Sequence, residues 1–90
     1  MYALVVEVTI DSSEEAAIKH LKEEVVPTVS QAPGFQAGYW MPKGGTGVSI
    51  VVFDDERNAT NAQQNVAVGS QPGPGVTVTR SEVRPVAASA

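Results

Sequence analysis

Apolar side chains follow two different periods along this chain. They recur at every second position in residues 3–10, and residues 48–53 are almost continuously apolar. Residues 35–41 and 76–86 also contain alternating apolar, aromatic and β-branched side chains. A period of two in segments of this length is typical of β-strands, so the pattern predicts four strands.

The segment between the first two predicted strands carries apolar residues at helical spacing. Ser12 followed by Glu15 forms a capping-box pattern at its start, and the apolar spacing continues to Val29. Pro27 lies late in this segment. Because proline lacks an N–H and crowds the preceding turn, we expect it to kink this helix or to convert its last turn.

A second helix is predicted after the third strand. Either Asp54 or Asp55 can cap its start, and it should end near Val66. Its apolar face is thin, and several of its residues are mediocre helix formers. The next segment, residues 69–75, is rich in glycine and proline, and this composition predicts an irregular loop.

The order strand, helix, strand, strand, helix, strand predicts a ferredoxin-like α+β fold. The four strands should form one antiparallel sheet in the order 4-1-3-2, with both helices on one face. Residues 1–86 then form a single domain, and residues 87–90 form a short C-terminal tail. The two most apolar strands, residues 3–10 and 48–53, occupy the centre of this sheet.

The third strand predicts that the protein pairs with a second copy of itself. Val48, Ile50 and Val52 point to one face of the sheet, while Val51 and Phe53 point to the other. The helices cover only one face, and a chain of 90 residues without cysteine has a marginal core. We therefore expect a homodimer that buries the open face; the alternative is a monomer with an ordinary exposed patch.

Composition narrows the classes of partner. The net charge is −4 and no basic stripe is present, so we expect no nucleic acid partner. No apolar run is long enough to span a bilayer and no export signal is visible, so we expect a cytoplasmic protein without a membrane partner. With no cysteine and His20 as the only histidine, we expect neither a metal site nor a cofactor.

Four short motifs carry a family resemblance. They are Val25-Val26-Pro27, Ala32-Pro33-Gly34-Phe35, Tyr39-Trp40 and Val52-Phe53-Asp54-Asp55. Over residues 1–86 the chain resembles the dimeric α+β barrel superfamily, and within it the antibiotic-biosynthesis-monooxygenase-like domains. The resemblance implies a homodimer whose two sheets form a barrel, with a ligand pocket in each subunit between sheet and helices. It implies no single chemistry, because one scaffold serves many functions.

The resemblance suggests a cofactor-free monooxygenase acting on a small aromatic or polyketide-like molecule. Trp40, Tyr39, Asn58 and Asn61 match, by residue type, the side chains that hold substrate in that branch. Tyr39 and Trp40 point to opposite faces, so only one can line a given pocket. The plainer interpretation is a packing aromatic and exposed asparagines. The haem-degrading branch needs a histidine on the second helix, whereas His20 is expected on the solvated side of the first, so we expect no haem.

Glu7 is a further catalytic candidate, because it lies within a predicted central strand. A carboxylate there needs a partner or takes up a proton. It either pairs with Arg80 or Arg84 on the last strand or serves as a general base. Whether the protein is an enzyme stays open; the alternative is a non-catalytic small-ligand-binding or dimerisation module.

Overall fold

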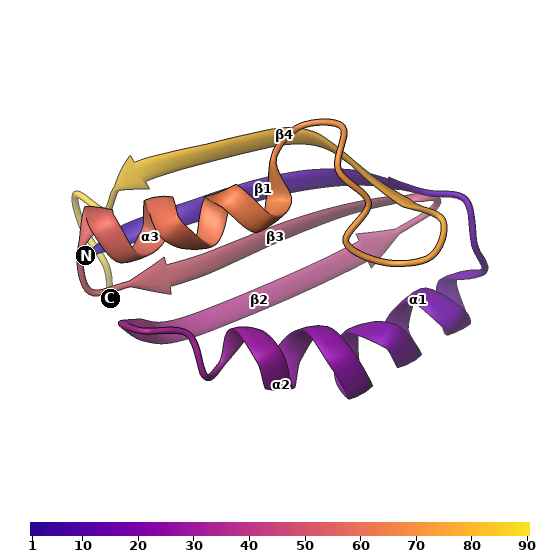
Figure 1. The fold of residues 1–90 in the computed structure, drawn as a ribbon, viewed down its shortest axis with the longest axis horizontal. Coiled ribbons are helices and arrows are strands. Elements are labelled where there is room, and N and C mark those ends of the chain that lie inside the picture. The colour runs from indigo at the N-terminus through magenta and orange to yellow at the C-terminus, as the bar shows by residue number, and fades with distance from the viewer.

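The computed structural model describes residues 1–90 and has one four-stranded sheet with a helical layer (Figure 1). The sheet is antiparallel in the order β2-β3-β1-β4, which is the predicted order counted from the opposite edge. This confirms the α+β class and is consistent with a ferredoxin-like arrangement. The elements in chain order are β1 (Tyr2–Ile10), α1 (Glu14–His20), the π-helical turn η1 (Leu21–Val25), α2 (Val26–Val29), β2 (Phe35–Lys43), β3 (Thr46–Phe53), α3 (Glu56–Gln63), the 3-10 turn η2 (Gln64–Val66) and β4 (Val76–Pro85).

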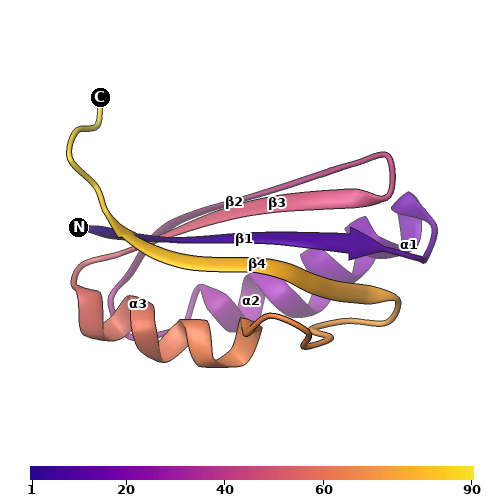
Figure 2. The same cartoon turned by 90° about the horizontal axis from the view of Figure 1, so that it is seen from above.

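All the helices lie on one face of the sheet, and Figure 2 shows the other face without any covering element. The buried core lies between the sheet and α3. Phe53 and Ala59 are fully buried there, and Phe53 packs edge-on against Phe35 with ring centroids 6.5 Å apart. The other members of this core cluster are Leu4, Val6, Val51 and Val78.

The start of the first helix differs from the predicted capping box. Ser13, not Ser12, is the N-cap, and its hydroxyl accepts a hydrogen bond from the N–H of Ala16 at 3.1 Å. Two residues before this cap, the N–H of Asp11 donates a hydrogen bond to the carbonyl oxygen of Gly75 at 2.6 Å. This long-range bond to the loop before β4 sets where the chain leaves β1, and sequence spacing does not reveal it.

The predicted change at Pro27 differs in place: the last turn, which contains Pro27, is α-helical, and the distortion is the wide turn η1 that comes just before it. The N–H of Val26 donates to the carbonyl of Leu21, five residues back instead of four. A π-type turn inserts one residue into the helix and relieves the crowding that a proline ring causes in a regular α-helix. The helical segment therefore continues through Pro27 and ends at Val29.

The predicted hairpin between β2 and β3 is also confirmed. Gly44 and Gly45 form its turn with φ angles of 57° and 83°, which glycine adopts without steric cost. At the next connection the structure decides between the two possible caps. Asp55 caps α3 by accepting the N–H of Asn58 at 2.8 Å, and Asp54 instead accepts the side-chain amide of Asn58.

A cavity between the sheet and the helices

A cavity of about 360 Å³ separates the first helical segment from α3, with the sheet as its floor. Its volume falls within the range of small-molecule pockets, about 300–1,000 Å³. A second cavity of about 110 Å³ adjoins it toward the loop of residues 69–75. The residues that line both cavities are Val6, Val25, Trp40, Ser49 and Val66.

Trp40 is the one aromatic side chain that lines both cavities. It lies on the helix-facing side of β2, and Gly38, two residues earlier, makes room for it. A Cβ atom at Gly38 would lie 2.6 Å from the indole ring, so only glycine allows the ring to lie over the strand in this way. Tyr39 points to the opposite face, where 59% of it is exposed, and lines neither cavity.

Three asparagines from α3 and η2 form one wall. Asn58, Asn61 and Asn65 all line the larger cavity, since positions three and four apart share one face of a helix. The side-chain amide of Asn58 donates to Asp54 at 2.8 Å, whereas the carboxamides of Asn61 and Asn65 make no hydrogen bond within the protein. Asn65 was not among the predicted site residues, although its spacing of four from Asn61 indicates it.

The smaller cavity ends at His20. The expectation that this side chain is simply solvated is wrong, because it is half-buried and contacts the loop of residues 69–75. Its Nε2 lies 3.4 Å from the carbonyl oxygen of Pro72, and a Cβ atom at Gly73 would lie 2.7 Å from its ring. The loop folds back over the end of α1, which helical periodicity alone does not anticipate.

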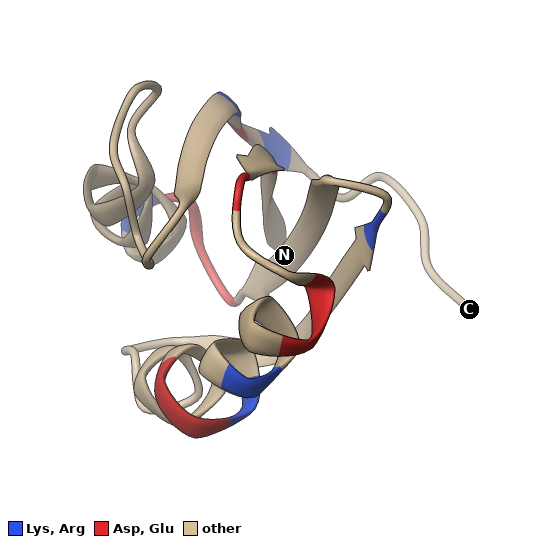
Figure 3. Cartoon of the chain, turned by 90° about the vertical axis from the view of Figure 1, so that its right-hand side faces the viewer, with Lys and Arg blue, Asp and Glu red and all other residues tan.

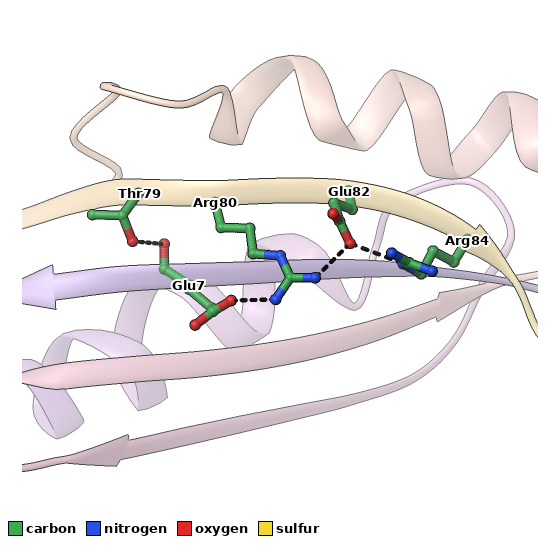
Figure 4. Close-up of polar contacts among 5 residues, drawn as sticks. All are labelled: Glu7, Thr79, Arg80, Glu82 and Arg84. Atoms are coloured by element: carbon green, nitrogen blue, oxygen red, sulfur yellow. Dashed lines mark hydrogen bonds and ion pairs between the residues drawn. The ribbon is translucent and has the colours of Figure 1, made fainter.

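Glu7 lies on the open face of the sheet, away from the cavity, and the structure pairs it with Arg80 (Figure 4). Its Oε2 accepts a hydrogen bond from the Arg80 guanidinium at 2.8 Å. The same guanidinium donates to Glu82 at 2.9 Å, and Arg84 donates to Glu82 at 2.8 Å. The alternating charges thus form a ladder along β4. The guanidinium groups of Arg84 and Arg80 lower the pKa of Glu82, and the two carboxylates raise the pKa of Arg80.

A β-bulge explains why Arg80 faces Glu7. The pairing of β1 with β4 shifts register between Glu7 and Val8, so that Thr79 is left without a partner on β1. The Thr79 hydroxyl donates to the carbonyl of Glu7 at 3.1 Å. This extra residue turns Arg80 toward the open face beside Glu7 and leaves Val78 in the core.

The cavity is therefore equipped for binding more than for proton transfer. It brings Trp40, Asn58 and Asn61 together, while Tyr39 and Glu7 lie on the opposite face of the sheet. His20 is the only ionisable side chain among the residues that line the two cavities, and it lines the smaller one alone. A mostly apolar, partly open cavity with a few amide and hydroxyl groups can hold and orient a small organic molecule.

Comparison with known proteins places no further constraint on this site. No protein-family model matches the chain, and no curated protein matches it either.

No helix is long and apolar enough to cross a membrane. Nowhere do three side chains of His, Cys, Asp or Glu gather closely enough to hold a metal ion.

Proposed function

We propose that this protein binds a small, largely apolar organic molecule in the cavity between its sheet and its helices. The observation that carries the proposal is the cavity itself, about 360 Å³ with Trp40 on one side and the Asn58–Asn61–Asn65 face on the other. Its lining is mostly apolar, so an apolar ligand that enters it removes apolar surface from water on both sides, which is favourable. A ligand in it would tie the first helical segment to the sheet.

The larger cavity can be tested by filling it. Ala62 lines it and is half-buried, so Ala62→Phe should occupy the space. A panel of small aromatic compounds is screened by ligand-observed NMR against this variant and the unmodified protein. The proposal requires compounds that bind the unmodified protein and that Ala62→Phe rejects while keeping its circular dichroism spectrum. A panel without any such compound contradicts it.

We also propose that a second copy of the chain covers the open face of the sheet, as in a dimeric α+β barrel. Side chains that point to this face are mostly apolar along β2, β3 and the start of β1. Tyr39, Met41 and Val48 are 59%, 48% and 37% exposed there. The charge ladder borders this apolar area along β4 (Figure 4). Because the ladder contains both positive and negative groups, two copies can bring their ladders together without an excess of either charge.

Light scattering tests the dimer. Val48→Glu places a charge on the open face, and Val68→Glu places the same charge at a site outside the sheet where the side chain is 66% exposed. We expect a dimer for the unmodified chain and for Val68→Glu, and a monomer for Val48→Glu. A monomer for the unmodified chain at micromolar concentration would remove the barrel from the proposal.

Cofactor-free oxygenation of an aromatic or polyketide-like molecule is the second candidate function. The gathering of Trp40 with Asn58 and Asn61 around one apolar site favours it, since such groups can hold an aromatic ring and its oxygen substituent. Glu7 is not a general base for this site, because it lies on the other face of the sheet in an ion pair. Oxygen uptake with polycyclic phenols, abolished in Ala62→Phe and kept in Glu7→Gln, is the expected result. If no phenol that binds causes oxygen uptake, the non-catalytic binding function is the one that remains.

A further inference from the structure

Charged side chains are absent from both cavities. None of the six Lys and Arg or ten Asp and Glu lines either space. Figure 3 shows these residues spread over several elements, including the first helical segment beside the cavity, where acidic and basic positions are mixed. The ladder on β4 is on the far face of the sheet. The one ionisable lining side chain, His20, belongs to the smaller cavity alone, so any charge on a molecule in the larger cavity would lack a counter-charge there.

Burying an ion without a partner is costly, whereas a neutral polar group needs only hydrogen bonds. The wall made by α3 and η2 supplies these bonds. The carboxamides of Asn61 and Asn65 make no hydrogen bond within the protein, and each offers two N–H donors and one oxygen acceptor. Ser49 adds a hydroxyl from β3, and its side chain also makes no hydrogen bond within the protein. The remaining lining is mostly hydrophobic.

We infer that the ligand is an uncharged molecule with an apolar body and a carbonyl or hydroxyl oxygen that the Asn61 and Asn65 carboxamides recognise. This inference rests on the proposed function and adds the ligand class. The apolar body lies over Val6, Val51 and Trp40 on the floor of the cavity. Both asparagines are exposed in part, so the oxygen lies at the mouth of the cavity, near solvent.

Three probes of matched shape test this ligand class. They are methyl naphthyl ketone, naphthoate and naphthylmethylammonium, substituted at the same ring position, so that a neutral carbonyl, an anion and a cation are compared. Calorimetry gives the dissociation constants, and the indole N–H signal of Trp40, the only tryptophan, reports binding in the cavity. We expect the ketone to bind about tenfold or more tightly than either ion.

Two variants test the carboxamides. Asn61→Ala removes a lining carboxamide, and Gln64→Ala removes a carboxamide at an exposed position that lines neither cavity. Loss of one hydrogen bond should weaken ketone binding about three- to tenfold in Asn61→Ala. Binding of unsubstituted naphthalene to Asn61→Ala, and of the ketone to Gln64→Ala, should be unchanged.

The outcomes separate the two proposals. Either ion binding in the cavity within threefold of the ketone overturns the inference and leaves the proposed function standing. Equal ketone binding by Asn61→Ala and the unmodified protein overturns the role given to the carboxamides. No shift of the Trp40 signal with any probe, naphthalene included, contradicts the proposed function itself.

Discussion

The turn before β2 offers a sharp test of the packing around the cavity. Gly34 has a φ angle of 78°, a region that costs other residues about 1–2 kcal/mol. It also lies against the Asp54–Asn58 pair. A Cβ atom there would overlap the Asp54 carboxylate oxygen and the Asn58 amide nitrogen. Gly34→Ala must therefore strain the backbone and separate these two side chains.

Gly44 provides the matched control. Its φ angle is 57°, and nothing lies within 4 Å of a Cβ atom built there. Gly44→Ala bears the backbone cost alone, so the difference between the two variants isolates the displaced Asp54–Asn58 hydrogen bond. A hydrogen bond to a charged group is worth about 1.5–3 kcal/mol, and exposure of Asp54 reduces this to about 1–2 kcal/mol.

Thermal unfolding followed by circular dichroism measures this difference. In a domain of this size, 1 kcal/mol shifts Tm by about 4–8 °C. Gly34→Ala should therefore melt about 4–16 °C below Gly44→Ala, and the gap should shrink when Asp54→Ala frees the Asn58 side chain. Equal Tm values for the two glycine variants would refute the packing described for this turn. So would a gap that Asp54→Ala leaves unchanged.

Three other changes probe the cavity, the charge ladder and the core. Gly73→Ala should push the loop of residues 69–75 off His20 and raise the quenching of Trp40 fluorescence by acrylamide. Adding His20→Ala should return the quenching to that of the unmodified protein. Unchanged quenching in Gly73→Ala would contradict the contact between the loop and His20. The two neighbouring arginines lower the pKa of Glu82 from its ordinary 4.5. The ionised carboxylate therefore contributes fully to the free energy of unfolding above pH 4.5, and this contribution is lost as the pH falls through the lowered pKa. Glu82→Gln should then lower the urea midpoint at neutral pH and have little effect in strong acid. A larger effect in strong acid than at neutral pH would contradict the ion pairs described for Glu82. Phe53→Ala removes the largest fully buried side chain and should cost about 3–5 kcal/mol in urea unfolding, and a cost below about 1 kcal/mol would place the core elsewhere.

The order and type of the elements could be predicted because each depends on local patterns. Alternation identified the four strands, and the glycines at residues 44–47 identified the hairpin turn. A distortion near Pro27 followed from the chemistry of the proline ring, but its place did not. The cap of the first helix could not be predicted, because Asp11 bonds to Gly75, more than sixty residues away.

The candidate site was predictable only by residue type. Alternation places Trp40 and Tyr39 on opposite faces, but it does not say which of them meets the helices. The partner of Glu7 depended on a bulge at Thr79, and neighbouring residues do not encode such an irregularity in a recognisable way. Helical periodicity predicts a solvated position for His20, because the loop that contacts it meets the helix only in the folded chain.

By itself the sequence determined the four strands, the two helical segments and the surplus of apolar side chains on the central strands. These follow from periodicity and backbone chemistry, which act over a few residues. Only the tertiary structure decided that Trp40 faces three asparagines across a cavity and that Glu7 is paired with Arg80 on the other side of the sheet. Such placements depend on which face each strand presents and on contacts between distant segments, and these are settled only when the layers pack together.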